Sequence, residues 1–255
     1  MNSVDQNRFT GQVAIVAGGA RGIGRGIAAR LLAEGAIVYI WDVNQDHINQ
    51  CRESLSSYKA RLRTEVVDIT DESVVHEGIN KVISEDGKID IMVNCAGIVG
   101  QTNVPIDQYD TTIFQRVLDV NITGPFLLTK YVIPHMTQRK YGRILHIASI
   151  GGKEGNPGMV GYAASKSGLM GLIKGAGKEF AESGITVNGI APAVIATEFN
   201  ENTDPAMLKY MTDKIPMKRM GTIEETAALA CWIVSDEASF NTGCIFDLSG
   251  GRATY

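Results

Sequence analysis

Short apolar runs without polar alternation recur along the chain and are separated by longer amphipathic stretches. Such runs are typical of parallel strands buried on both faces, whereas stretches of ten or more residues with helical periodicity predict helices. We expect strands at residues 12–17, 36–41, 62–67, 89–93, 143–148, 185–190 and 244–248. We expect helices up to Gly35, at 45–57, 71–86 and 107–138, around Tyr162 as far as 183, and at 223–235.

Strands that alternate with helices in this way form βαβ units. The pattern therefore predicts an α/β fold with a doubly wound parallel sheet and helices on both faces. The long stretch at 107–138 is interrupted near Gly124 and Pro125, and 150–158 and 192–218 have no regular pattern. Because no linker or change of composition divides the chain, we expect one domain over 1–255, with a polar, flexible lead-in at 1–10.

Composition limits the kinds of partner. The 255 residues are 44% hydrophobic and 20% charged, with a net charge of −4 and no lysine or arginine cluster, which argues against nucleic acid. The apolar runs are too short for a membrane span, and the first residues do not resemble a signal peptide. The four cysteines lie far apart, and the histidines lack ligand spacing: Cys51, Cys95, Cys231, Cys244. We expect a cytoplasmic protein with reduced thiols, no metal and no membrane partner.

A glycine-rich turn follows the first expected strand, with the spacing Gly18-x3-Gly22-x-Gly24. Backbone N–H groups at the start of the next helix suit a pyrophosphate, because the helix dipole and the unpaired donors both favour an anion. Asp42 ends the second strand, where a carboxylate can bind a ribose diol, and Asp68 ends the third. Each aspartate alone could be a helix cap, but together with the turn they indicate a dinucleotide.

The side chains near this turn also indicate which dinucleotide binds. The carboxylate of Asp42 would repel a 2′-phosphate, and Val43 offers no ligand for one. Arg21, within the glycine turn, argues the other way because it could meet a phosphate. We weigh the fixed carboxylate more heavily than a flexible arginine, so NAD is expected as the cofactor.

Tyr162 and Lys166 are four residues apart and share one face of an expected helix. A nearby cation lowers the pKa of a phenol from about 10 towards the range useful for proton transfer. Ser149, at the end of the fifth strand, could hold the same substrate oxygen from the other side. The alternative is a tyrosine that anchors its helix beside a solvated lysine.

Taken together, these residues resemble the short-chain dehydrogenase/reductase family, over nearly the whole chain after residue 10. The motifs that carry the resemblance stand in the family's order: Gly18-x3-Gly22-x-Gly24, Asp68, Asn94-Cys-Ala-Gly97, Asn121, Ser149, Tyr162-x3-Lys166, Pro192 with Thr197, and Ser249-Gly-Gly251. The resemblance implies a Rossmann-type sheet of about seven strands and a homotetramer. Two positions depart from it, because Ala17 and Ala193 replace the usual threonine and glycine; Ala193 puts the path of residues 193–197 in doubt.

The resemblance also implies roles. Tyr162 would exchange a proton with the substrate, Lys166 would hold the nicotinamide ribose and lower the pKa of Tyr162, and Ser149 would orient the substrate oxygen. Asn121 would hold a water that links Lys166 to solvent; otherwise it only caps or kinks its helix. The expected NAD contacts are Gly18, Arg21, Gly22, Ile23, Gly24, Asp42, Asp68, Ile69, Asn94, Ala96, Gly97, Tyr162, Lys166, Pro192, Ile195 and Thr197.

Substrate identity depends on the irregular segments. Lys153, Glu154 and Asn156 could form a polar wall beside Ser149 and Tyr162, and 192–218 resembles the family's substrate lid. Arg252, near the C-terminus, could reach a substrate carboxylate in a neighbouring subunit. We therefore expect NAD-dependent oxidation of a secondary alcohol on a small hydroxylated molecule: a sugar acid such as a 2-keto-3-deoxy sugar acid, a sugar or a polyol. The alternatives are a 3-oxoacyl-carrier-protein reductase and a non-catalytic NAD sensor.

Overall fold

The computed structural model describes residues 7–198 and 205–253. Its centre is one parallel sheet of seven strands in the order β3-β2-β1-β4-β5-β6-β7, which confirms the predicted doubly wound fold. The strands are β1 (Val13–Ala17), β2 (Ile37–Asp42), β3 (Leu62–Val66), β4 (Ile91–Asn94), β5 (Gly142–Ile147), β6 (Ile185–Pro192) and β7 (Ile245–Leu248). The order reverses between β1 and β4, so the loops after these strands diverge and leave space for a ligand there.

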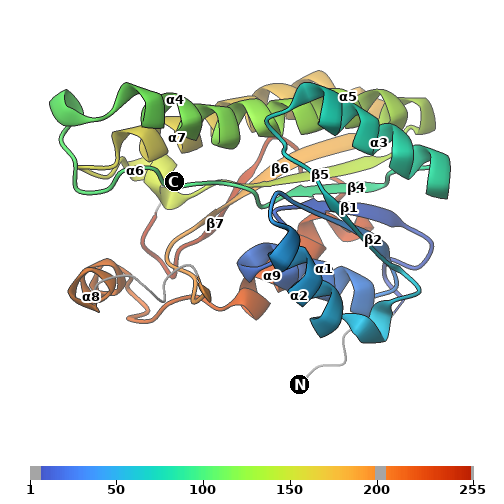
Figure 1. Cartoon of the computed structure of the whole chain (residues 1–255), viewed down its shortest axis with the longest axis horizontal. Coiled ribbons are helices and arrows are strands. Elements are labelled where there is room, and N and C mark those ends of the chain that lie inside the picture. Colours follow the sequence, from blue (N-terminus) through green and yellow to red (C-terminus); the bar gives the residue numbers. More distant parts are fainter. Residues whose placement is uncertain (1–6, 199–204, 254–255) are drawn as a thin grey trace.

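Helices cover both faces of the sheet (Figure 1). One face packs against α1 (Gly22–Ala33), α2 (Gln45–Ser54) and α9 (Ile223–Ile233). The other packs against α3 (Glu72–Asp86), α5 (Gly124–Arg139) and α7 (Val160–Glu179), with α4 (Thr111–Leu118) leading into α5. Side chains from each strand face alternately fill these two apolar layers, which is why the strands read as unbroken apolar runs in the sequence.

The structure bears out one sequence expectation about irregular segments and corrects two others. The 107–138 stretch is interrupted next to Gly124, by a π-helical turn, Asp119–Thr123, that joins α4 to α5. The glycine-rich segment after β5 is helical in its first part, α6 (Ile150–Glu154), and the irregular segment 192–218 contains α8 (Pro205–Asp213). Both helices have weak sequence signals, because α6 is only five residues long with two glycines and α8 is a nine-residue piece within an otherwise irregular segment.

The lead-in is also more ordered than expected over its described part. Phe9 is fully buried, and the Arg8 guanidinium donates a hydrogen bond to Glu34 at 2.6 Å. Residues 1–6 of the expected flexible segment lie outside the described residues. None of the helices in the described part of the chain is long and apolar enough to cross a membrane.

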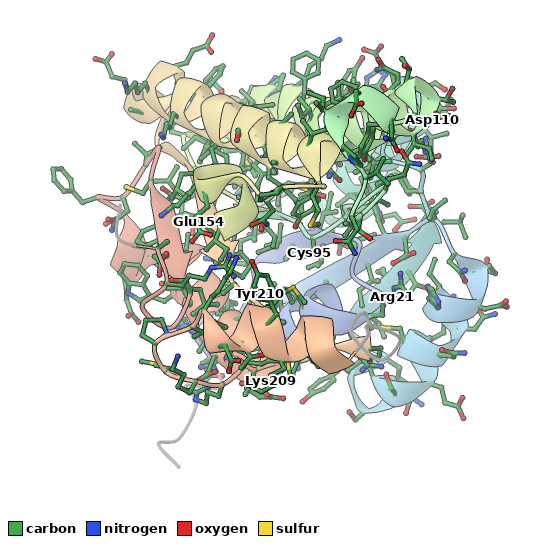
Figure 2. The ribbon with its side chains drawn as sticks, turned by 90° about the vertical axis from the view of Figure 1, so that its left-hand side faces the viewer. Arg21, Cys95, Asp110, Glu154, Lys209 and Tyr210 are labelled. Carbon is green, nitrogen blue, oxygen red and sulfur yellow. The ribbon has the colours of Figure 1, made fainter. Side chains whose placement is uncertain are left out.

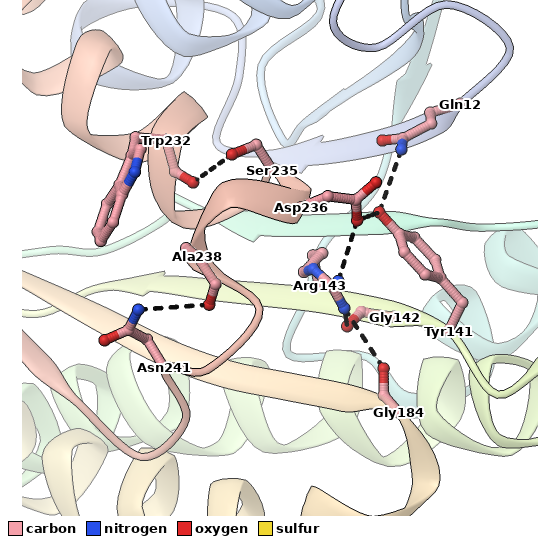
Figure 3. Close-up of polar contacts among 10 residues, drawn as sticks. All are labelled: Gln12, Tyr141, Gly142, Arg143, Gly184, Trp232, Ser235, Asp236, Ala238 and Asn241. Atoms are coloured by element: carbon pink, nitrogen blue, oxygen red, sulfur yellow. Dashed lines mark hydrogen bonds and ion pairs between the residues drawn. The ribbon is translucent and has the colours of Figure 1, made fainter.

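A polar network closes the edge of the sheet where the strands begin (Figure 3). Arg143, only 6% exposed, donates to the carbonyls of Gly142 and Gly184 and to Asp236 at 3.1 Å. The hydroxyl of Tyr141 donates to the same carboxylate at 3.0 Å. These bonds satisfy backbone carbonyl groups at the starts of the strands. This edge of the sheet therefore has a structural role, and the candidate site lies at the opposite edge, where the strands end.

Candidate active site

The glycine turn between β1 and α1 lies directly against the loop after β4. Gly18 has φ = +65°, and a Cβ at this position would lie 2.5 Å from the backbone nitrogen of Ala96, so only glycine fits. Arg21 precedes α1 and makes no side-chain capping bond to it, whereas Asn44 and Asp71 cap α2 and α3. The uncapped helix start and the bare turn fit the predicted pyrophosphate site.

Asp42 stands at the end of β2 with its carboxylate against this turn. One oxygen accepts a hydrogen bond from the Ala20 N–H at 3.4 Å and the other from the Asn44 N–H at 3.1 Å. The carboxylate is partly exposed and Val43 beside it is 64% exposed. A dinucleotide bound to the glycine turn would therefore place its ribose diol next to Asp42.

Asp68 and Ile69 border the adjoining part of the site. Asp68 accepts two hydrogen bonds from Thr70, from its N–H at 2.9 Å and its hydroxyl at 2.7 Å. Ile69 is buried against Gly124, where a Cβ would lie 2.5 Å from its Cδ1. These contacts fix the turn after β3 beside the start of α5.

The loop after β4 connects the cofactor side to the catalytic residues. The Oδ1 of Asn94 accepts from the Ala96 N–H at 3.2 Å, while its buried Nδ2 has no partner among the described residues. A Cβ at Gly97 would lie 3.2 Å from Oδ1 of Asn121 and 3.3 Å from Nζ of Lys166. The backbone of Gly97 therefore packs directly against the side chains of Asn121 and Lys166.

Asn121 lies in the π-helical turn and is fully buried. Its Nδ2 donates to the Ile98 carbonyl at 2.8 Å and to Ser165 Oγ at 2.9 Å, and its Oδ1 accepts from the Ile98 N–H at 2.9 Å. A π-helical turn widens the helix and turns one residue inwards, which is how Asn121 reaches both the β4 loop and α7. Asn121 thus does more than cap or kink its helix.

Ser149, Tyr162 and Asn156 converge around Gly151. A Cβ at Gly151 would lie 3.4 Å from Ser149 Oγ, 3.4 Å from Tyr162 Cε1 and 3.1 Å from Asn156 Nδ2. Ser149 caps α6 by accepting from the Gly151 N–H at 3.0 Å, and its side chain hydrogen-bonds to Tyr162. The structure therefore brings together Ser149, Tyr162 and Asn156, three of the residues expected at the substrate.

Lys166 lies one helical turn further along α7 and is 5% exposed. Its Nζ donates to the Ile147 carbonyl at 2.8 Å and lies 5.8 Å from the centre of the Tyr162 ring. The ammonium group lies near the phenol ring of Tyr162 and borders Gly97. It therefore lies between the loop after β4 and the hydroxyl groups of Ser149 and Tyr162.

The chain after β6 returns to the glycine turn. Pro192 ends β6, Ile195 pairs with Gly221, and Thr197 lies 3.7 Å from where a Cβ at Gly22 would stand. Among the described non-glycine residues, φ is positive only at Asn103, Lys140 and Lys218, so Ala193 adopts an ordinary conformation. The doubt about the path of 193–197 is thereby removed, because the replaced glycine is not needed there.

Two residues of the expected polar wall form ion pairs with the C-terminal part of the chain; Glu154, on α6, is labelled in Figure 2. Lys153 is largely buried and pairs with Asp247 at 3.8 Å, and Glu154 accepts from Arg252, the nearest atoms being 2.7 Å apart. Within its own chain, the guanidinium of Arg252 binds Glu154. The expected contact of Arg252 with a substrate carboxylate in a neighbouring subunit stays a prediction.

Comparison with known proteins agrees with this geometry. The family model described as enoyl-(acyl carrier protein) reductase matches residues 17–253. The 2-dehydro-3-deoxy-L-rhamnonate dehydrogenase (NAD(+)) of Sphingomonas sp. (strain SKA58) is 40% identical over 255 residues, which cover 99% of this chain and 100% of that protein. This chain belongs to the short-chain dehydrogenase/reductase family. The predicted resemblance is confirmed, and the protein is an oxidoreductase of that family.

Two further relatives show how diverse the family is. The 3-oxoacyl-[acyl-carrier-protein] reductase FabG of Thermotoga maritima is 33% identical over 245 residues, covering 96% of this chain and 98% of that protein. The crystal structure of NAD+-bound xylitol dehydrogenase matches with a TM-score of 0.91 and 31% identity, over 96% of this chain and 100% of that one. Relatives named for different substrates therefore share the fold, so the fold alone does not determine the substrate.

Burial shifts the pKa values of the two neighbouring site residues Tyr162 and Lys166. Burial raises the pKa of Tyr162, and the hydrogen bond from Ser149 opposes this rise without cancelling it. Burial also lowers the pKa of Lys166 to about 8. Burial thus disfavours the charged form of both groups, and the expected lowering of the pKa of Tyr162 by Lys166 stays a prediction.

One residue beside the site was missed in the sequence. His146, on β5, is fully buried, and burial together with Lys166 lowers its pKa to about 3. The hydroxyl of Thr129 donates to the Pro125 carbonyl, so it accepts from Nε2 of His146 at 3.1 Å, and the ring is neutral. A lone histidine inside an apolar strand gave no sequence signal, because only the sheet register shows what it faces.

Proposed function

We propose that the protein oxidises a secondary alcohol of a small, hydroxyl-rich substrate to a ketone with NAD, and that the substrate is a sugar acid of the 2-keto-3-deoxy type, or else a sugar or polyol. The observation that carries this proposal is the convergence of Ser149, Tyr162 and Asn156 around Gly151. It offers one proton carrier and two further polar groups for substrate oxygens. The substrate named in the Sphingomonas relative supports the sugar-acid class.

The residues present fit NAD. A side chain at Gly18 would fill the space beside Ala96, the start of α1 lacks a side-chain cap, and Asn94 keeps a buried, unpartnered Nδ2 at the cofactor side. Bound NAD would supply the hydride acceptor. The glycine turn would hold its pyrophosphate, Asp42 the adenosine ribose, and Ile195 with Thr197 the carboxamide, because the segment after β6 lies beside that turn.

The proton would be handled by the chain's own side chains. Ser149 would donate a hydrogen bond to the substrate oxygen while Tyr162 accepts the hydroxyl proton. Lys166 would exchange its bond to the Ile147 carbonyl for the nicotinamide ribose, and the charge of oxidised nicotinamide would favour the phenolate. Asn121 would hold the water that continues the path to solvent.

The test is a turnover screen of sugar acids, polyols, plain alcohols and acyl thioesters with NAD, NADP and their reduced forms at several pH values. We expect the highest kcat/KM for a sugar acid with NAD. Preference for a long acyl thioester with NADPH would replace this proposal by the carrier-protein reductase that the FabG relatives suggest. Asp42 and the net charge of −4 oppose that alternative, since it needs a 2′-phosphate site and a basic docking surface. Tight NAD binding without turnover of any compound would favour the sensor.

Four further features belong to the proposal. The chain would work as one catalytic domain in the cytoplasm and assemble into a homotetramer, as the family resemblance implies. Residues 192–218 would form the substrate lid, with α8 as its helical part. In Figures 1 and 2, α8 lies across from α6 at the edge where the strands end, which is the position a lid would occupy.

A further inference from the structure

Two ion pairs connect α6 to the C-terminal segment, residues 247–253. Consecutive residues of α6 bind different parts of it: Lys153 pairs with Asp247 of β7, and Glu154 accepts hydrogen bonds from Nε and Nη2 of Arg252. The side chains of Lys153 and Arg252 are only 7% and 8% exposed. Both pairs are therefore shielded from solvent on the cationic side, which separates them from ordinary surface pairs.

The C-terminal segment is itself braced. Ser249 Oγ donates to Asp247 Oδ1 at 2.6 Å and accepts from the Ala253 N–H at 2.9 Å. The Gly250 carbonyl accepts from the Met217 N–H at 3.2 Å, so the chain that follows α8 is attached to the same segment. Arg252 therefore extends from a turn that hydrogen bonds hold in place, and its bonds to Glu154 can hold α6 in position.

α6 in turn positions the catalytic hydroxyl. The helix starts at Ser149, which caps it, and it ends at Glu154, only one and a half turns later. Between them Gly152 packs against α7, where a Cβ would lie 2.7 Å from the backbone carbon of Lys166, and its carbonyl accepts from Ser167 Oγ at 2.6 Å. The Glu154 end of α6 is therefore connected to Ser149 by only about one and a half turns of helix, so the position of Glu154 bears on the position of Ser149.

We propose that Arg252 is a positioning residue for catalysis: through Glu154 it clamps α6 so that Ser149 stays in register with Tyr162. Arg252 does not touch the reacting atoms and does not bind the substrate carboxylate in this arrangement. The positioning role of Arg252 rests on alcohol oxidation by Tyr162 and not on the substrate being a sugar acid. The positioning proposal and the sugar-acid proposal can therefore fail independently. A misplaced catalytic group is costly because a shift of about 1 Å can reduce the rate by about 100-fold.

Loss of the Arg252–Glu154 ion pair should change the pH dependence of the oxidation rate. The hydrogen bond from Ser149 lowers the pKa of Tyr162 against the effect of burial. A loosened α6 weakens that bond in the free enzyme, so the pKa of Tyr162 rises and the rising limb of kcat/KM for oxidation moves to higher pH. The other groups around the phenol stay as they are: Lys166 on α7, Tyr109 against Gly161, and Cys95 and His146, which burial keeps neutral.

The experiment compares Glu154→Gln, Arg252→Gln, Arg252→Lys and the charge-swapped variant Glu154→Arg/Arg252→Glu with the unmutated protein. Glu72→Gln is the matched control, because it breaks an ion pair to Lys130 of 2.6 Å on the distant α3–α5 surface. The measurements are kcat and KM with the best alcohol from the screen and with an uncharged polyol, the pH profile of kcat/KM, NAD affinity, and hydrogen exchange of residues 150–155. The last measurement needs no substrate.

We expect Glu154→Gln and Arg252→Gln to behave alike: kcat falls about tenfold on charged and uncharged substrates, and exchange in α6 accelerates. The charge-swapped variant Glu154→Arg/Arg252→Glu should recover part of kcat and part of the protection of α6 from hydrogen exchange. Arg252→Lys should be intermediate, because lysine lacks the bidentate guanidinium group. NAD affinity and the control should remain unchanged. The proposal is overturned if Arg252→Gln raises KM for an acid alone while Glu154→Gln does not, or if exchange in α6 is unaltered in both.

Discussion

The charge on Asp42 gives the sharpest test of cofactor choice, through Asp42→Asn. Asparagine has nearly the same shape and keeps one oxygen to accept from the Ala20 or Asn44 N–H. The glycine turn should therefore hold its position. The substitution removes little except the negative charge, so a change in the preference between NAD and NADP reports that charge.

The magnitude follows from distance and exposure. Two unit charges about 4 Å apart repel by about 1 kcal/mol in water and about 4 kcal/mol near a protein surface. A 2′-phosphate carries about 1.5 to 2 negative charges, and Asp42 is partly exposed. We therefore expect repulsion of about 2–4 kcal/mol, which is about 30- to 1,000-fold in the ratio of kcat/KM between the two cofactors.

The assay is steady-state kinetics of Asp42→Asn with both cofactors at low and high salt. kcat/KM with NADP should rise by at least about 30-fold, while that with NAD falls only a few-fold because one ribose hydrogen bond weakens. In the unmutated protein, added salt should narrow the preference, since it screens the repulsion. Asp46→Asn, four residues on in α2, is the control and should change neither value. Equal use of NADP by the unmutated protein would refute the reasoning, as would an unchanged preference in Asp42→Asn.

Three other outcomes are expected. Tyr162→Phe keeps the ring but loses the proton carrier, so kcat should fall at least about 100-fold with NAD affinity unchanged; a residual rate above a tenth would contradict its role. Glu34, whose side chain is 1% exposed, binds Arg8 and Arg30, so Glu34→Gln should lower Tm by about 6 °C or more, and a shift under about 2 °C would exclude a structural role. The pKa of His146 is lowered to about 3, so the unfolded chain takes up a proton below about pH 6.5 that the folded protein refuses. Unfolding free energy should therefore fall by up to about 1.4 kcal/mol per pH unit on acidification, a slope that His146→Leu should reduce in denaturant titrations.

The sequence was sufficient wherever a side chain's role follows from its place on a strand or helix. Buried parallel strands show as apolar runs, and the residue after each run lies at the carboxyl edge of the sheet, which placed Asp42, Asn94 and Ser149 correctly. Tyr162 and Lys166 share a helix face by simple periodicity. These relations are local, so they need no knowledge of the packing.

The tertiary structure decided everything that depends on which segments meet. Arg252 and Glu154 are 98 residues apart in the chain, and no periodicity relates them; only the turn after β7 brings them together. The neutral state of His146 and the raised pKa of Tyr162 likewise come from burial, which a sequence position does not specify. Local spacing fixes which groups can act together, whereas packing fixes their partners and their charge, because solvent exclusion and long-range contact exist only in the folded chain.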